Sequence, residues 1–442
     1  MKIRLENNFI TDNSAECEAG CFFMRTSANA KFESEAAQKG AQIISIAQAK
    51  ELLNINPRIK IVGITGTNGK TTTAAAIYST LLDLGFSCGL SGTRGAFINE
   101  RRIDEKGLTT SSVFKTMSYL YEASKQGCEY FVMEVSSHAI AQNRIEGLEF
   151  ALKIFTNLSQ DHLDYHGSMQ EYAAVKSSFF ADDAPKLINA DDGHIKFNPA
   201  NALTYGIKNA ASFGVSGYGL KGGIDALVRT PNGDNAQLQS DLIGEFNLYN
   251  LTAAFAAVKI LTELPNEEIA KALANFGGVE GRVQIVNKNP LVIVDFAHTP
   301  DGIEKVLNAL RASGEIIAVF GAGGDRDHGK RPKMGAIAEH FAKICIVTSD
   351  NPRSEDPDEI IEQICAGMRR KDKILKIADR KEAIARALDL AKNGEMIAIL
   401  GKGDETYQEI KGVKHPFSDK QVVSELVAAR GESNLDYLKD GQ

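Results

Sequence analysis

Five short apolar runs in the second half of the chain restrict its fold more than any other feature. They are LVIVDF (291–296), IIAVF (316–320), ICIVT (344–348), ILKIA (374–378) and MIAIL (396–400). Amphipathic stretches with helical spacing separate these runs. Because strands that alternate with helices pair in parallel, we predict an α/β fold with a doubly wound, Rossmann-like sheet in this region.

Polar segments follow four of these predicted strands. Ligands of doubly wound sheets bind beyond the carboxyl ends of the strands, so we expect the four segments to line one rim. They are Asp295–His298, Gly321–Asp327, Asp350–Arg353 and Gly401–Glu405. The third opens the run DNPRSEDP (350–357), which places an arginine at its centre. A solvated turn is the simpler reading of this run, because Asp, Asn and Pro favour turns.

The first half of the chain has an α/β rhythm of its own. It begins with IVGIT (61–65), followed by a helical run from Lys70 and further apolar runs at Tyr130–Val135, Lys153–Leu158 and Lys186–Ile188. Residues 211–244 predict short antiparallel strands. A chain of 442 residues is too long for one compact core. We therefore predict three domains, at residues 1–58, 59–283 and 284–442.

Composition narrows the function classes. The formal net charge of -7 argues against a nonspecific nucleic-acid binder, which needs a basic surface. The opening MKIRLENNFI lacks the apolar core of a signal peptide, and no run of eighteen apolar residues occurs. The six cysteines have no metal-ligand spacing. We expect a cytoplasmic monomer with neither nucleic acid nor membrane as partner.

The stretch GITGTNGKTTT (63–73) joins a predicted strand to a predicted helix. Backbone N–H groups of such a glycine-rich turn cradle phosphates, a lysine reaches the terminal phosphates, and a threonine hydroxyl reaches Mg²⁺. The usual first glycine is replaced by Ile64, so the loop is a variant. A plain strand-to-helix turn is the competing reading, and Gly-Lys-Thr-Thr makes nucleotide binding the better one.

Several longer motifs accompany this loop. They are MEVSSHA (133–139), FTNLSQDHLDYHG (155–167), EYAAVK (171–176), GEFNLYN (244–250), GVEGR (278–282), DFAHTPDG (295–302) and GGDRDHGKRP (323–332). With GTNGKTT (66–72), they resemble the Mur ligases, ATP-dependent amide-forming enzymes of peptidoglycan precursor synthesis. The resemblance implies a small N-terminal UDP-binding cap, a central P-loop ATPase domain and a C-terminal amino-acid-binding domain.

The resemblance also implies roles for individual residues. Lys70, Glu134, His162 and Lys176 match catalytic positions, with Thr71, Glu134, His162 and Lys176 (as a carbamate) as ligands of two Mg²⁺ ions. ATP would contact Gly66, Thr67, Asn68, Gly69, Lys70, Thr71, Thr72, Asn247, Asn250, Arg282 and Asp295. The UDP-muramoyl dipeptide would contact Ser14, Thr109, Thr110, Ser136 and Arg144. On the residues alone, a solvated helix lysine is the better reading of Lys176.

DNPR resembles the signature of the family branch that adds meso-diaminopimelate to UDP-N-acetylmuramoyl-L-alanyl-D-glutamate. The resemblance implies an amino-acid site made of Arg326, Asp350, Asn351, Pro352, Arg353, Gly401 and Glu405. Diaminopimelate ends in an ammonium plus a carboxylate, whereas L-lysine ends in an ammonium alone. The planar guanidinium of Arg353 suits a carboxylate, and a site with an unpaired guanidinium would reject lysine.

The chain departs from the family pattern at several positions. Asp404 stands where histidine is usual, and Ala15 stands where the cap has an arginine. Two other functions stay open: the same ligase with L-lysine as the added residue, and a P-loop ATPase or GTPase switch that performs no ligation. The switch has no reason for a second Rossmann-like sheet with arginines on its rim.

Overall fold

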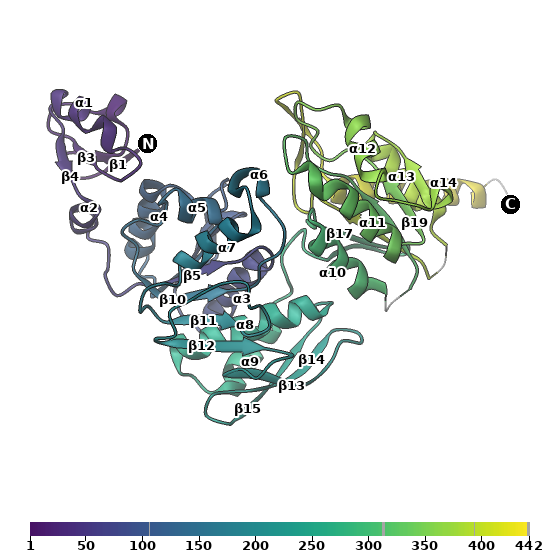
Figure 1. Cartoon of the computed structure of the whole chain (residues 1–442), viewed down its shortest axis with the longest axis horizontal. Coiled ribbons are helices and arrows are strands. Elements are labelled where there is room, and N and C mark those ends of the chain that lie inside the picture. The colour runs from purple at the N-terminus through teal and green to yellow at the C-terminus, as the bar shows by residue number, and fades with distance from the viewer. Residues whose placement is uncertain (106, 312–313, 393, 440–442) are drawn as a thin grey trace. The chain divides into compact units, whose positions relative to one another are not determined.

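A computed structural model describes residues 1–105, 107–311, 314–392 and 394–439. Two compact units make up the chain, and each is described by itself. The first comprises Met1–Leu158, Gln170–Asp241 and Asn247–Gly277. The second comprises Ser159–Met169, Leu242–Phe246 and Gly278–Gln442. In Figure 1 the first unit runs from purple to teal, and most of the second runs from green to yellow.

The N-terminal part of the first unit contains a small four-stranded sheet in the order β1-β2-β3-β4. Its elements are β1 (Lys2–Arg4), β2 (Phe9–Thr11), β3 (Phe22–Met24), β4 (Gln42–Ile44), α1 (Glu33–Gln38) and α2 (Ile46–Leu52). Ser45 and Gln48 form a capping box that fixes the start of α2. Ile10, Met24 and Ile44 belong to one apolar cluster with Phe114 and Met117 of α4 (Val113–Lys125).

An eleven-stranded sheet forms the body of the first unit, in the order β15-β14-β13-β12-β11-β10-β5-β9-β6-β7-β8. Its strands are β5 (Lys60–Thr65), β6 (Cys88–Gly92), β7 (Gly95–Ile98), β8 (Arg101–Asp104), β9 (Tyr130–Glu134), β10 (Phe150–Phe155), β11 (Lys186–Asn189), β12 (Ala202–Gly206), β13 (Phe213–Gly219), β14 (Ile224–Arg229) and β15 (Asn235–Ser240). The strands from β6 to β13 in this order pair in parallel, and antiparallel strands extend both edges. The parallel core brings the carboxyl ends of β5, β9 and β10 to one edge.

Helices of the first unit include α3 (Lys70–Asp83), α5 (Ser137–Ala141), α7 (Met169–Ser178), α8 (Glu245–Thr262) and α9 (Asn266–Ala274). Alanines and apolar side chains bury most of α8, including Phe255 and Val258. This helix lies beside the sheet in Figure 1. No helix among the described residues is long and apolar enough to cross a membrane.

The second unit contains a six-stranded sheet in the order β16-β17-β21-β18-β19-β20. Its strands are β16 (Gln284–Lys288), β17 (Leu291–Asp295), β18 (Ile316–Phe320), β19 (Ile344–Val347), β20 (Ile374–Lys376) and β21 (Met396–Leu400). All neighbours are parallel except β16 and β17. A separate hairpin, β22 (Tyr407–Ile410) with β23 (Val413–Pro416), follows the sheet.

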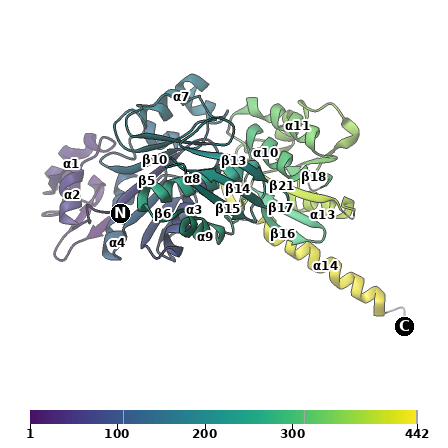
Figure 2. The same cartoon turned by 90° about the horizontal axis from the view of Figure 1, so that it is seen from below.

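Helices cover both faces of this sheet. One apolar cluster joins α10 (Pro300–Arg311), α11 (Arg331–Phe341) and α12 (Pro357–Cys365) to one face. A second cluster joins α13 (Arg380–Leu390) and α14 (Asp419–Lys439) to the other. Figure 2 shows α14 running outward from this sheet. A short helix, α6 (Leu163–His166), also belongs to this unit.

The predicted α/β class and the doubly wound C-terminal sheet are confirmed, and all five predicted strands of that sheet form. The four-stranded N-terminal sheet, the β6–β8 extension and the β22–β23 hairpin were not predicted. Their strands have only three to five residues each, so their formation depends on pairing with neighbouring strands.

Candidate active site

The phosphate loop lies between β5 and α3, at the carboxyl edge of the parallel strands. Its two glycines, Gly66 and Gly69, have φ angles of 153° and 86°. A Cβ at Gly66 would lie 1.9 Å from Thr156 Oγ1, and one at Gly69 would lie 2.4 Å from Asn250 Oδ1. Only glycine fits either position, because both the backbone angle and the close neighbour exclude a side chain.

Lys70 and Thr71 open α3, so their side chains start at a helix N-terminus. Lys70 Nζ donates to the carbonyls of Gly66 and Thr67, each at 2.8 Å, and thus spans the loop. Thr71 Oγ1 donates to Glu134 Oε2 at 2.9 Å. Anions bind readily at such a terminus, because its unpaired N–H groups and the helix dipole favour negative charge.

Glu134 ends β9, and its carboxylate is buried beside Thr71. Its oxygens also accept hydrogen bonds from the backbone N–H and the hydroxyl of Thr93. A carboxylate and a threonine hydroxyl are the oxygen ligands that Mg²⁺ prefers, so this pair fits one magnesium ion. Among the described residues, no group of three or more His, Cys, Asp or Glu side chains is placed to hold a metal by itself.

Lys176 on α7 is fully buried. Its Nζ donates to Gly66 O at 3.0 Å and lies 4.8 Å from the ring centroid of Tyr172. On the residues alone, the better interpretation of Lys176 is a solvent-exposed helix lysine. That interpretation is wrong, because the side chain is buried. Burial of an ammonium is costly unless it has partners, and this one lies against the phosphate loop.

Asn247 and Asn250 lie one turn apart on α8, and Asn250 Nδ2 donates to Asn247 Oδ1 at 3.1 Å. Asn250 Oδ1 also accepts a hydrogen bond from Thr73 of α3 at 3.3 Å. The structure thus brings both predicted nucleotide residues of α8 against the start of α3. Thr72 is buried on the same helix.

A second cluster of predicted residues surrounds the loop after β9. Thr110 Oγ1 donates to the Glu134 carbonyl and accepts from the Ser136 N–H, each at 2.9 Å. Arg144 Nη1 donates to Thr110 O at 3.0 Å. Thr93 Oγ1 lies 3.2 Å from both Thr109 Oγ1 and Glu134 Oε2, within hydrogen-bond distance of each. Four of the five residues predicted to contact the UDP-muramoyl dipeptide therefore lie in one cluster with Thr71 and Glu134.

Ser14, the fifth, makes its contacts elsewhere. Its hydroxyl donates to Glu35 Oε2 at 2.9 Å, and Lys39 Nζ donates to its carbonyl, also at 2.9 Å. All three residues belong to the N-terminal sheet region. Among the described residues, Ser14 makes no hydrogen bond with Thr110 or Arg144.

In the second unit, Asp295 ends β17 and is buried, where its carboxylate accepts from the N–H groups of Val283 (2.7 Å) and Ala297 (2.6 Å). Burial raises the pKa of Asp295, although the positive charge of Arg282 and the hydrogen bonds from these N–H groups act to lower it. The Arg282 guanidinium stacks 4.4 Å from the centroid of Phe296. Arg282 therefore lies close enough to Asp295 for its charge to act on that carboxylate.

His162 precedes α6 with a φ of 54°, and its Nε2 lies 3.3 Å from Asp161 Oδ2. Burial alone raises the pKa of Asp161, but the charges of His162, Lys330 and His298 outweigh it and lower that pKa to about 2. Burial and the nearby Lys330 lower the pKa of His298. Asp161 is thus an anion that orients His162.

The predicted rim forms within the second unit. Gly401 N–H donates to Asp295 O, and Asn351 Nδ2 donates to Glu405 Oε2 at 2.9 Å. Asp350 Oδ2 is buried and has no hydrogen-bond partner among the described residues, and a Cβ at Gly401 would lie 2.5 Å from it. A buried carboxylate oxygen without a donor is costly, so this oxygen fits a ligand that brings an N–H group.

Arg353 has a φ of 52°, a strained angle for a residue with a side chain. Its N–H donates to Glu409 O and its carbonyl accepts from Lys411, which tie it to the β22–β23 hairpin. Its Nη1 donates to Gly324 O at 2.6 Å, and its Nε lies 3.5 Å from Glu409 Oε2. Nη2 makes no hydrogen bond with the described residues. That edge of the guanidinium suits a carboxylate.

Arg326 is exposed, and its Nη1 donates to Asp325 O at 3.1 Å. The loop that carries it contacts the DNPR turn closely, because a Cβ at Gly324 would lie 1.9 Å from Pro352 O. The two arginine-bearing loops are therefore neighbours.

A buried ion pair holds these two loops together. Arg331 is fully buried, and its Nη1 and Nη2 donate to Glu355 Oε2 (2.7 Å) and Oε1 (2.9 Å). Arg331 Nη2 also donates to Gly323 O, while Glu355 accepts from the Asp325 N–H. These hydrogen bonds lower the pKa of Glu355 to about 2. The acidic half of DNPRSEDP is therefore structural.

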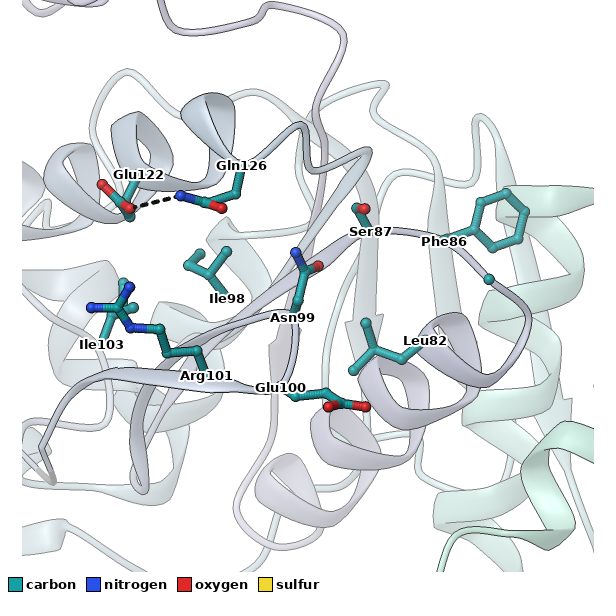
Figure 3. A pocket seen from close by; sticks show the side chains of 11 residues that line it. Leu82, Phe86, Ser87, Ile98, Asn99, Glu100, Arg101, Ile103, Glu122 and Gln126 are labelled. Carbon is teal, nitrogen blue, oxygen red and sulfur yellow. Dashed lines mark hydrogen bonds between the residues drawn. The ribbon is translucent and has the colours of Figure 1, made fainter.

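A pocket of about 430 Å³ in the first unit lies away from the phosphate loop (Figure 3). The end of α3, the β7–β8 hairpin and the end of α4 line it, with Ser87, Arg101 and Gln126 among its residues. Ser87 immediately precedes β6, whereas the phosphate loop follows the carboxyl end of the parallel β5. The pocket thus belongs to the opposite edge of the sheet from the candidate site.

Family models match two segments of the chain. Residues 64–258 match the Mur ligase middle domain, and residues 281–403 match the Mur ligase glutamate ligase domain. A Wolinella succinogenes protein called UDP-N-acetylmuramoyl-L-alanyl-D-glutamate--2,6-diaminopimelate ligase is 49% identical over 96% of this chain and 98% of its own. A Helicobacter pylori protein of the same name is 47% identical over 95% of each chain. The chain belongs to the Mur ligase family.

Solved structures agree with this Mur ligase assignment. A structure of a protein with the same name as those relatives is 31% identical, with a TM-score of 0.67 over 97% of this chain and 98% of that one. A folylpolyglutamate synthase from Mycobacterium tuberculosis shares the fold, with a TM-score of 0.66 over 80% of this chain and 91% of its own at 19% identity.

The sequence analysis of this Mur ligase missed several residues that hold its site together. Gln142 Oε1 accepts from Arg144 Nε at 3.0 Å. Lys402 contacts both Asn351 and Glu405, and Arg331 pairs with Glu355. Lys402 and Glu355 stand inside motifs already singled out, so their position was a usable signal. Nothing in the sequence pairs Arg331 with Glu355, which lie 24 residues apart.

Proposed function

We propose that this chain is an ATP-dependent ligase that adds meso-diaminopimelate to the D-glutamyl γ-carboxylate of UDP-N-acetylmuramoyl-L-Ala-D-Glu. The observation that carries the proposal is the position of Arg353. Arg353 Nη2 has no hydrogen-bond partner among the described residues, and it lies on the same rim as the buried Asp350 Oδ2, which has none among them either. Together they suit a ligand end that carries both a carboxylate and an ammonium. The names of the relatives, which match nearly the whole chain, support the same substrates.

The reaction begins with phosphoryl transfer. The γ-carboxylate oxygen takes the γ-phosphoryl group of ATP, and ADP leaves. The amine of diaminopimelate then attacks the carbonyl carbon of the acyl phosphate, loses a proton, and phosphate leaves. Because both partners of the first step are anionic, positive charge must lie around them. Lys70 supplies such a charge at the phosphate loop, whose backbone carbonyls already fix its ammonium.

Two magnesium ions are part of the proposal. Thr71 and Glu134 would hold the first, His162 would be a ligand of the second, and Lys176 as a carbamate would be a further metal ligand. Bound magnesium would offset the negative charge that develops on the phosphoryl oxygens. The burial of Lys176 against Gly66 O supports a carbamate, because a modified lysine there would be an anionic ligand rather than a buried cation.

The remaining site residues take binding roles. ATP is held by Gly66, Thr67, Asn68, Gly69, Lys70, Thr71, Thr72, Asn247, Asn250, Arg282 and Asp295. Thr109, Thr110, Ser136 and Arg144 hold the UDP-muramoyl dipeptide, with Ser14 as a contact in the cap. Arg326, Asp350, Asn351, Pro352, Arg353, Gly401 and Glu405 hold diaminopimelate. Residues 1–58, 59–283 and 284–442 serve as the cap, ATPase and amino-acid domains of a cytoplasmic monomer.

The experiment that tests the function is an assay of phosphate release. Purified protein receives ATP, Mg²⁺ and UDP-N-acetylmuramoyl-L-Ala-D-Glu, with meso-diaminopimelate or L-lysine offered separately. Turnover that depends on diaminopimelate supports the proposal. Turnover with L-lysine alone keeps the ligase and overturns the role of Arg353. Nucleotide hydrolysis that needs neither amine nor dipeptide indicates a P-loop switch instead.

A further inference from the structure

Lys402 is a buried cation on the rim that no role above uses. Its side chain is fully buried in the turn after β21. Its Nζ donates to Glu405 Oε2 at 2.8 Å and to Asn351 Oδ1 at 3.0 Å. A buried ion pair is often replaceable by apolar residues without loss of stability, so stability alone is a weak reason for a lysine here.

Glu405 is oriented by this contact. Its Oε2 accepts two hydrogen bonds, from Lys402 Nζ and from Asn351 Nδ2. Its Oε1 has no hydrogen-bond partner among the described residues. One carboxylate oxygen is therefore committed to the protein, and the other remains for a donor on the ligand.

Lys402 also reaches Arg353 through the hairpin. Asn351 Oδ1, which accepts from Lys402, accepts a second hydrogen bond from the Glu409 N–H at 2.9 Å. Glu409 O in turn accepts from the Arg353 N–H at 3.0 Å. Lys402, Glu405, Glu409 and Arg353 thus belong to one hydrogen-bonded network with Asn351 at its centre.

The charge of Lys402 changes what Glu405 can attract. With an ammonium already 2.8 Å away, the carboxylate has most of its charge compensated, so a second ammonium gains less there. A ligand with a bare terminal ammonium would also bring no carboxylate to Arg353 Nη2. A ligand with an ammonium and a carboxylate satisfies both groups.

We infer that Lys402 is a positioning residue that determines amine specificity: it compensates and orients Glu405, so that the rim selects an amino acid whose far end is a zwitterion over one that ends in an ammonium alone. This inference rests on the proposed function, because it concerns the same amino-acid end.

The test is a competition assay on the full-length protein. Lys402→Gln removes the charge and keeps a hydrogen-bond donor, while Lys371→Gln removes an exposed lysine of the same unit as the matched control. Equal amounts of meso-diaminopimelate and L-lysine compete in one reaction, and the two products are measured by mass spectrometry. We expect Lys402→Gln to lower the preference for diaminopimelate by about tenfold or more, with the KM values for ATP and the dipeptide changed about twofold or less.

A second measurement needs only the unaltered protein. L-2-Aminopimelate has the far carboxylate without the ammonium, and L-lysine has the ammonium without the carboxylate. Because Glu405 pairs with Lys402 while Arg353 Nη2 has no hydrogen-bond partner among the described residues, we expect aminopimelate to inhibit the diaminopimelate reaction at a lower concentration than L-lysine. The reverse order would overturn the inference even if Lys402→Gln failed to fold.

The outcomes separate the two proposals. If the unaltered protein forms no product with diaminopimelate, the proposed function is wrong and the inference is wrong with it. If product forms but Lys402→Gln slows both amines equally, Lys402 is merely structural and only the inference is overturned. A changed preference in Lys371→Gln of the same size would also overturn it, since any lost surface charge would then suffice.

Discussion

The phosphate loop is built mainly from backbone groups, whereas the rim of the C-terminal sheet is built from charged side chains. Both lie at the carboxyl ends of parallel strands. At the loop, Gly66 and Gly69 admit no side chain, and Lys70 and Lys176 both donate to the Gly66 carbonyl. At the rim, Arg353, Lys402 and Arg331 each contact an acidic or amide side chain.

This difference follows from what each site recognises. Phosphates are the same in every nucleotide, so a loop of N–H groups and one lysine suffices. Amino acids differ only in their side chains, so the rim needs several groups at fixed distances to separate diaminopimelate from lysine. Substitutions at the loop should therefore reduce every reaction, and substitutions at the rim should change the choice of amine.

The largest effect is expected from Lys70→Ala. Because the proposed role of Lys70 places its charge where the phosphoryl group transfers, its loss should reduce turnover by roughly 10²–10³-fold with any amine. Phosphate release in the presence of diaminopimelate measures this loss. Lys196→Ala removes an exposed lysine of the same unit and should leave turnover unchanged. If Lys70→Ala kept a normal kcat and raised only the KM for the amine, the phosphate loop would affect the choice of amine as the rim does. The proposed difference between the loop and the rim would then be wrong.

Arg353→Lys should have the next largest effect. Lysine keeps the charge but loses the planar edge that pairs with a carboxylate, so we expect the KM for diaminopimelate to rise by about tenfold or more. The KM for ATP should stay within about twofold, since Arg353 belongs to the rim. Arg369→Lys, an exposed arginine of the same unit, is the control. An equal rise in both KM values would show that the two regions are not separate in function.

The sequence predicted the loop more completely than the rim, and the reason is physical. A phosphate loop is local, so Gly66, Lys70 and Thr71 stand within a few residues and their spacing is visible. The strand ends of the C-terminal sheet could also be predicted, which placed Asp350, Arg353 and Glu405 on one rim.

The contacts that orient those residues could not be predicted. Arg331 lies 24 residues from Glu355 in the sequence, and Lys402 lies 51 residues from Asn351. Both pairings depend on how the loops fold over the ends of the strands. The N-terminal sheet was missed for a related reason. Its strands have three residues each, too few to show a period, and pairing with neighbours decides them.

The ion pair between Arg331 and Glu355 predicts how the stability of the fold depends on pH. Hydrogen bonds from Arg331 lower the pKa of Glu355 to about 2 from an ordinary value of 4.5. Since the folded-state pKa is the lower one, the stabilisation is complete above about pH 4.5 and is lost as the pH falls from there towards 2.

Glu355→Gln should therefore be less stable than the unaltered protein at neutral pH, by at most about 3 kcal/mol, with a difference that shrinks below about pH 4.5. Urea unfolding at several pH values measures this difference. We also expect a KM for diaminopimelate raised severalfold, because the pair holds the two arginine loops. Glu359→Gln, an exposed glutamate of the same unit, is the control and should show neither change. A constant difference across the acid range would mean that the ion pair is not its cause.

Ser14→Ala should have the smallest effect and extends the comparison to the N-terminal cap. The Ser14 hydroxyl already donates to Glu35, so it is held within the cap rather than presented as a free donor. We expect the KM for the UDP-dipeptide to rise about twofold or less, the loss of one modest hydrogen bond at most. Arg144→Ala provides the contrast, because Arg144 donates to the carbonyl of Thr110, whose hydroxyl donates to the Glu134 carbonyl. The loss of Arg144 should raise the same KM by about tenfold or more. Steady-state kinetics with the dipeptide varied measures both. If Ser14→Ala had the larger effect, the cap would contribute more to dipeptide binding than the middle domain. The comparison would then need a third binding region, one that depends on the single hydroxyl of Ser14.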